Sequence, residues 1–222
     1  MKCPACAANV TVDNNNTFFR CDYCRNQISI IKPTHVNSVI DSLNENEQKL
    51  FANYISILEQ SMKAGNYYEA NKYCNKALEI NPKSGSLWEN KAICSFWSSS
   101  IDSLTSNSAN EILTYLNASK QNEPDSKTYS EIAGMIADNL WIIANYKYNN
   151  IRPNTGTALF SKEQLREHLI YLDIIELCFV ICPKIEYLKR SVDLLIYGKI
   201  KWVTLSSGRY IKSFVSTGIG FE

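Results

Sequence analysis

The chain has 222 residues, and 45% of them are hydrophobic, which is enough apolar material for one compact domain beside a small module. Its 23 basic residues nearly balance its 22 acidic residues, so the formal net charge is +1. This composition excludes a disordered chain. The balanced charge also provides no overall field that would attract nucleic acid or an anionic membrane surface.

Four cysteines near the N-terminus form two CxxC pairs with fourteen residues between them. Two thiolates spaced in this way lie on one tight turn, and a second such turn completes the tetrahedron that Zn²⁺ prefers. No fifth His or Asp ligand accompanies them, so we expect one closed, structural zinc ion without an open position for a catalytic water. The alternative is buried or disulfide-bonded cysteine pairs, and the chain shows no route to the oxidising compartment that disulfides require. The predicted ligands are Cys3, Cys6, Cys21 and Cys24.

The residues around these cysteines have the alternation of short strands. Val10 and Val12 alternate with polar residues, an Asp-Asn-Asn-Asn turn follows at 13–16, and isoleucines recur after the second pair. We therefore expect three short strands within residues 1–32. So small a segment buries too little apolar surface to fold alone, and we expect the metal to supply the missing free energy.

This combination of cysteine pairs and strands resembles the zinc-ribbon family over residues 1–32. The family usually has glycine after the second cysteine of each pair, and here those positions are Ala7 and Arg25. A left-handed backbone at such a residue costs about 1 kcal/mol, which the metal bonds can offset. The resemblance implies a structural zinc site in a rigid recognition or docking element.

A linker follows the ribbon. Pro33 ends the last predicted strand, and apolar residues at 36, 39, 40 and 43 then recur at helical spacing. We expect a linker helix over residues 33–44. His35 at its start has no partner in the sequence, so we expect a capping or surface residue and not a metal ligand.

Helical periodicity continues through residues 45–154. One helix is expected over 45–64, where Gly65-Asn66 ends it, and a second over 67–80, where Asn81-Pro82 ends it. Further helices are expected over 109–121 and from about 125 to 148. The predicted fold class is therefore mainly α, with the small β ribbon at the N-terminus.

The first helical hairpin resembles a tetratricopeptide repeat. Trp88 follows Tyr54 by 34 residues, which is the period of that family. Pro124 follows Pro82 by 42 residues, so the later repeats are degenerate. The resemblance implies a solenoid of helical hairpins, and it rests on the spacing of Gly65, Tyr67, Ala70, Ala77, Pro82 and Ala92.

In tetratricopeptide repeats the first helix of each hairpin lines a concave groove, so the resemblance implies a surface that binds a protein or peptide partner. Some members of the family clamp a C-terminal carboxylate with basic residues and asparagines, and these residues are absent at the corresponding positions here. An extended or helical peptide with apolar anchors therefore suits the predicted groove better. The competing interpretation is that Phe96 and Trp97 are buried by the following helix. The predicted groove residues are Ile55, Glu59, Met62, Glu89, Ile93, Phe96 and Trp97.

The composition changes near residue 155, because all 23 asparagines precede it. We expect a C-terminal helical hairpin over 155–205 that closes the solenoid, although a separately acquired module would leave the same trace, and a tail over 206–222. Cys178 and Cys182 lie one helical turn apart, with His168 on the same helix, so a second metal site is conceivable. Their apolar neighbours favour core thiols.

No glycine-rich phosphate loop, dinucleotide fingerprint or nucleophile pattern is present, so we expect no enzyme. The prediction is a non-enzymatic interaction module, that is, an adaptor, scaffold or regulator. The alternative is a nucleic-acid-binding regulatory protein that uses the ribbon and the basic segment after residue 184. The longest apolar stretch, 169–182, contains two acidic residues, so no membrane span and a cytoplasmic protein are expected.

Overall fold

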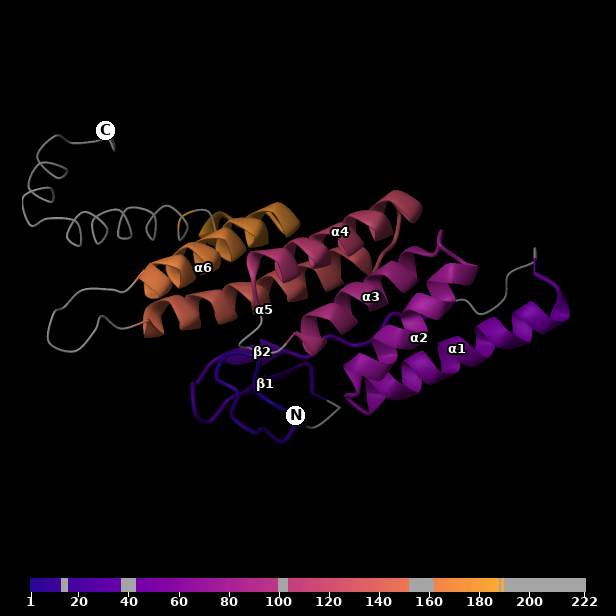
Figure 1. The fold of residues 1–222 in the computed structure, drawn as a ribbon, viewed down its shortest axis with the longest axis horizontal. Coiled ribbons are helices and arrows are strands. Elements are labelled where there is room, and N and C mark those ends of the chain that lie inside the picture. The colour runs from indigo at the N-terminus through magenta and orange to yellow at the C-terminus, as the bar shows by residue number, and fades with distance from the viewer. Residues whose placement is uncertain (13–15, 37–42, 100–103, 152–161, 188, 190–222) are drawn as a thin grey trace, which may run out of the picture.

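The computed structural model describes residues 1–12, 16–36, 43–99, 104–151, 162–187 and 189. These residues form a small N-terminal ribbon and a set of paired helices (Figure 1). The predicted mainly α class with a small β element is confirmed, whereas the tetratricopeptide-like solenoid stays a prediction. Most of the predicted second C-terminal helix and the tail over 206–222 lie outside the described residues.

The ribbon contains one antiparallel pair, β1 (Phe18–Arg20) with β2 (Gln27–Ser29). Phe19 opposes Ile28, and both side chains are buried, as the alternation of a half-buried strand requires. Three strands were predicted, but in the described residues the first cysteine turn is flanked only by an isolated bridge between Lys2 and Asn9. Beside this bridge, Met1 and Val10 also exchange two hydrogen bonds, of 2.9 and 3.0 Å.

The described start of the predicted linker helix, residues 33–36, is extended. Residues 30–36 have no helical turn, and residues 37–42 of the predicted 33–44 helix lie outside the described part. Pro33 disfavours helical geometry at the residue before it, and the backbone of Thr34 is hydrogen-bonded to a side chain on a distant helix. These contacts keep the described start of the linker extended, and the helix predicted over residues 33–44 stays a prediction for residues 37–42.

The first hairpin consists of α1 (Glu45–Lys63) and α2 (Tyr67–Ile80), so the predicted bounds 45–64 and 67–80 are confirmed to within one residue. Asn44 and Glu47 form a capping box at the start of α1. Gly65 adopts a φ of +73° in the turn between the helices, a conformation that glycine adopts without strain.

Two more pairs follow, α3 (Gly85–Ser98) with α4 (Ser106–Asn122), and α5 (Tyr129–Asn150) with α6 (Lys162–Ile181). Each helix packs against its pair partner, and α3 also packs against α2 and α5. Helix α3 is therefore central, and its residues 89–94 are buried all round. None of the helices described has both the length and the apolar character needed to cross a membrane.

Candidate metal centre

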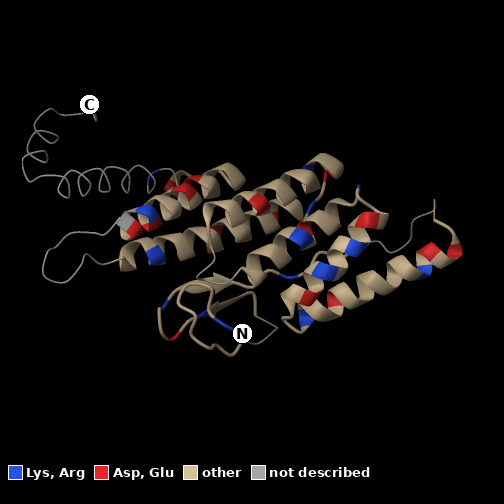
Figure 2. Cartoon of the chain, in the orientation of Figure 1, with Lys and Arg blue, Asp and Glu red and all other residues tan. Residues whose placement is uncertain are grey.

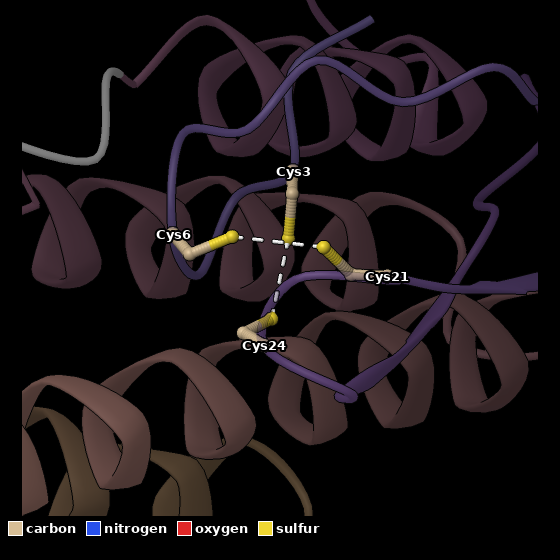
Figure 3. Close-up of side chains that lie close together, drawn as sticks. All are labelled: Cys3, Cys6, Cys21 and Cys24. Carbon is tan, nitrogen blue, oxygen red and sulfur yellow. Dashed lines mark hydrogen bonds between the residues drawn. The ribbon is translucent and has the colours of Figure 1, made fainter.

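Two turns of the ribbon direct four cysteine sulfurs toward one centre (Figure 3). All four Sγ atoms lie within 4.8 Å of one another; the Cys6–Cys21 distance is 3.6 Å and the Cys3–Cys24 distance is 3.8 Å. A disulfide requires about 2.05 Å, and the four thiols are free. A tetrahedron with metal–sulfur bonds of about 2.3 Å has edges of about 3.8 Å. The predicted cysteines therefore form a site that could hold a metal ion.

The two cysteine turns have the same backbone geometry. The residue after the second cysteine is left-handed in each, with φ of 63° at Ala7 and 62° at Arg25. The left-handed backbone predicted at these two non-glycine residues is therefore confirmed. Each turn is closed by a pair of backbone hydrogen bonds. These run from Ala7 N to Cys3 O at 2.9 Å, from Cys3 N to Ala8 O at 2.8 Å, from Arg25 N to Cys21 O at 2.8 Å and from Cys21 N to Asn26 O at 3.0 Å.

The environments of the thiols differ. Burial raises the pKa of Cys3 and also that of Cys6. Burial acts to raise the pKa of Cys21, but hydrogen bonds from the backbone N–H groups of Cys24 and Tyr23 and from the thiols of Cys6 and Cys24 together lower this pKa to about 7. A divalent cation between the sulfurs would favour the thiolate form of all four.

Two buried asparagines fasten the ribbon and linker to the helices. Asn139 of α5 accepts from the Ser29 backbone N–H at 2.9 Å and donates to the Ser29 carbonyl oxygen at 2.9 Å. Asn90 of α3 makes the same pair of bonds to Thr34, at 2.8 and 2.7 Å. Both asparagines are fully buried. Sequence reasoning missed them, although an asparagine on an apolar helix face is a usable signal of a buried polar contact.

Glu89, the neighbour of Asn90, is a fully buried hub and not a groove residue open to solvent. Its two carboxylate oxygens accept hydrogen bonds from four hydroxyl groups, which matches the number of acceptor positions of a carboxylate. The donors come from the linker, from α4 and from the segment that leads into α5. They are Thr34 at 2.8 Å, Ser119 at 3.3 Å, Ser126 at 2.8 Å and Thr128 at 2.8 Å.

Most of the predicted groove residues are also covered. Ile55, Met62, Ile93 and Phe96 are buried, so Phe96 follows the competing core interpretation. A binding role for these residues stays untested, but in this conformation they offer no open apolar groove. The physical reason is helix packing: α1 packs against α2, and α3 packs against α2, α4 and α5.

Two predicted groove residues remain partly accessible. Glu59 lies 3.7 Å from the ring of His35, whose side chain is exposed as expected for a surface residue. Trp97 is half-buried and stacks on Tyr67 at a centroid distance of 5.7 Å. Trp97 also lines a pocket of about 290 Å³ that the first cysteine turn borders through Pro4.

The conceivable second metal site does not form. In the described part of the chain, the N-terminal cysteines are the group close enough together to hold a metal, and Cys178, Cys182 and His168 are not members of it. Cys178 is fully buried, and burial raises the pKa of its thiol. Cys178 is therefore a core thiol, as its apolar neighbours in the sequence predicted.

Comparison with known proteins identifies no relative. No family model matches the chain, and neither a curated protein nor a solved structure is detectably similar to it.

Proposed function

We propose that this protein is a non-enzymatic interaction module, an adaptor, scaffold or regulator, in which one structural zinc ion holds the ribbon rigid and the helices bind a protein or peptide partner. The observation that carries the proposal is the closed four-sulfur centre on a ribbon that is hydrogen-bonded to α5 through Ser29 and continues into a linker hydrogen-bonded to α3 through Thr34. The ribbon is thereby held in place against the helices, and a pre-organised arrangement suits recognition.

Zinc is the metal that best suits the centre. Thiolate sulfur is a soft ligand that selects zinc over magnesium or calcium, and the two measured sulfur–sulfur distances fit the edge of a zinc tetrahedron. Four sulfur ligands fill the coordination sphere, so no position is left for a substrate or a catalytic water. This closed coordination is the reason for proposing a structural role.

A helical array of the tetratricopeptide type is part of the proposal. Three consecutive hairpins pack side by side, and α3 contacts both α2 and α5. We also place the protein in the cytoplasm, because its eight free cysteines suit a reducing compartment.

Nucleic-acid binding is the second candidate, and the exposed side of the ribbon favours it. Phe18 is 49% exposed and Tyr23 is 75% exposed, and the exposed residues Arg20 and Arg25 lie on the same small module. Such aromatic and basic side chains can stack on bases and contact phosphates. Against this candidate, basic and acidic positions are interspersed along the helices, as Figure 2 shows.

The test is affinity capture of the full chain from cells of the native host, with and without nuclease, followed by mass spectrometry and nucleic-acid detection. A stoichiometric protein that survives nuclease supports the adaptor function. The doubly substituted variant Phe18→Ala with Tyr23→Ala should leave that capture unchanged. Loss of all binding after nuclease, or in this variant, would favour the nucleic-acid function instead.

A further inference from the structure

The chain's own extended segment crosses the first helix of each hairpin in turn. The segment comprises residues 28–36, which we call the cis segment. Ser29 is bound by Asn139 of α5, Thr34 by Asn90 of α3, and His35 lies beside Glu59 of α1. Successive residues of the cis segment thus contact α5, α3 and α1.

These helices recognise the backbone of the cis segment. Each buried asparagine accepts from the N–H and donates to the C=O of one residue, as a neighbouring β-strand would do. Such contacts select an extended conformation and are indifferent to the side chain of the residue bound. Peptides that add to a sheet edge are recognised through their main chain in the same way.

The side chains of the cis segment define the chemistry of an occupant. Ile31 is 2% exposed and Val36 is 1% exposed, so the bound segment buries apolar, β-branched side chains, whereas Ile28 opposes Phe19 within the ribbon. The Thr34 hydroxyl donates to Glu89 at 2.8 Å. A suitable ligand is therefore an extended, largely uncharged peptide with β-branched apolar residues and one hydroxyl group.

We propose that the inner face of α1, α3 and α5 is a binding site for an extended peptide of this chemistry, occupied by the cis segment while the metal-loaded ribbon is folded. This inference rests on the proposed interaction function and names its ligand class and its regulation. Release of the metal unfolds the ribbon, withdraws the cis segment and opens the site.

Two physical arguments support this mode of control. An occupant tethered in the same chain has an effective concentration in the millimolar range, so a free peptide competes poorly while the ribbon is folded. Once the cis segment leaves, Asn90 and Asn139 lose their backbone partners and Glu89 loses the Thr34 hydroxyl, so these polar groups become available to another extended chain. An incoming extended backbone restores those bonds.

The experiment uses the full chain and a fluorescent peptide with the sequence of residues 27–36, and reads fluorescence anisotropy with zinc bound and after chelation under reducing conditions. We expect binding to the metal-free chain, and binding at least tenfold weaker to the zinc-loaded chain. Asn139→Leu should weaken binding to the metal-free chain by roughly tenfold, because two hydrogen bonds are lost. A scrambled peptide is the control.

Circular dichroism is recorded on the same samples. Absence of peptide binding to a metal-free chain that keeps its helical signal would overturn the proposal, as would loss of that signal on chelation, because the site would then not exist apart from the ribbon. An unchanged affinity in Asn139→Leu would also contradict it.

A second variant opens the site without a chelator. Ile31→Glu places a charge at a buried position of the cis segment and leaves the cysteines intact, so the zinc-loaded variant should bind the peptide at least tenfold more tightly than the zinc-loaded parent chain. No gain in binding by a helical, zinc-loaded variant would refute the inference. Failure of the proposed function is a separate result, because cellular capture of a partner can fail while this peptide binds.

Discussion

Asn90 and Thr34 lie 56 residues apart in the sequence, and they exchange two hydrogen bonds, from the Thr34 N–H to Asn90 Oδ1 at 2.8 Å and from Asn90 Nδ2 to the Thr34 carbonyl oxygen at 2.7 Å. Both residues are buried. The linker is thereby part of the folded core, and it joins the ribbon to helix α3.

The first prediction concerns this pair. Asn90→Leu removes both hydrogen bonds and leaves the Thr34 N–H and C=O buried without partners, so the free energy of unfolding should fall by about 2–4 kcal/mol. Urea denaturation of the zinc-loaded chain measures the change. Asn53→Ala, at an exposed position of α1, is the control and should change stability by less than about 0.5 kcal/mol. Equal effects of the two substitutions would contradict the structural role of Asn90.

The second prediction concerns the metal. Cys3→Ser and Cys21→Ser each remove one of the four sulfurs, so the chain should lose stoichiometric zinc and the ribbon should unfold. Elemental analysis reports the metal per chain, and amide hydrogen exchange reports the ribbon. Cys182→Ser alters a cysteine outside the centre and should keep one zinc per chain. Unchanged metal content in Cys3→Ser would exclude the proposed centre.

The third prediction compares two glycines in helices. A Cβ at Gly85 would lie 2.6 Å from the Cβ of Glu123, whose carboxylate accepts from the Gly85 N–H at 2.8 Å. Gly85→Ala should therefore destabilise the fold by about 1–3 kcal/mol. A Cβ at Gly134 would meet no atom within 4 Å, so Gly134→Ala should stabilise α5 by about 0.5–1 kcal/mol. Thermal or urea unfolding of both variants measures the two changes in stability. Because these changes are expected to have opposite signs, each variant serves as the control of the other.

The fourth prediction concerns alkaline pH. Burial raises the pKa of the Cys74 thiol to about 12. The unfolded chain releases this proton near the ordinary thiol pKa, whereas the folded chain keeps it, so stability is present below that pKa and falls as the pH rises above it. Between pH 8 and pH 10 the loss for this one thiol should be about 1 kcal/mol.

Urea denaturation of the parent chain and of Cys74→Ala at both pH values measures this loss. The variant should show a smaller decrease in stability than the parent chain, because the remaining titrating groups are shared by the two. The nearby Lys91, whose pKa is lowered by burial, is present in both chains. Identical pH dependence of the two chains would show that Cys74 does not contribute.

Local signals in the sequence determined the four-cysteine cluster and the helices of the first hairpin. Two CxxC pairs predict four sulfurs on two turns, because that spacing allows both thiolates of a pair to bind one ion. Asn44, Gly65 and Asn66 mark helix ends through capping and turn chemistry, which depends on neighbouring residues alone. These features were predictable because their causes lie within a few residues.

Contacts between distant residues decided the rest. Residues 33–36 read as the start of a helix, but the buried amide of Asn90 holds the backbone of Thr34 extended. Glu89 was predicted to be an acidic residue of the groove. In the structure its carboxylate is buried and accepts hydrogen bonds from four hydroxyl groups in other parts of the chain. A hydrogen bond across 56 residues leaves no periodicity in the sequence, since it depends on where the whole chain places its two partners. The sequence alone therefore determined the four-cysteine cluster and the helices of the first hairpin, and only the tertiary structure decided which helices the linker contacts.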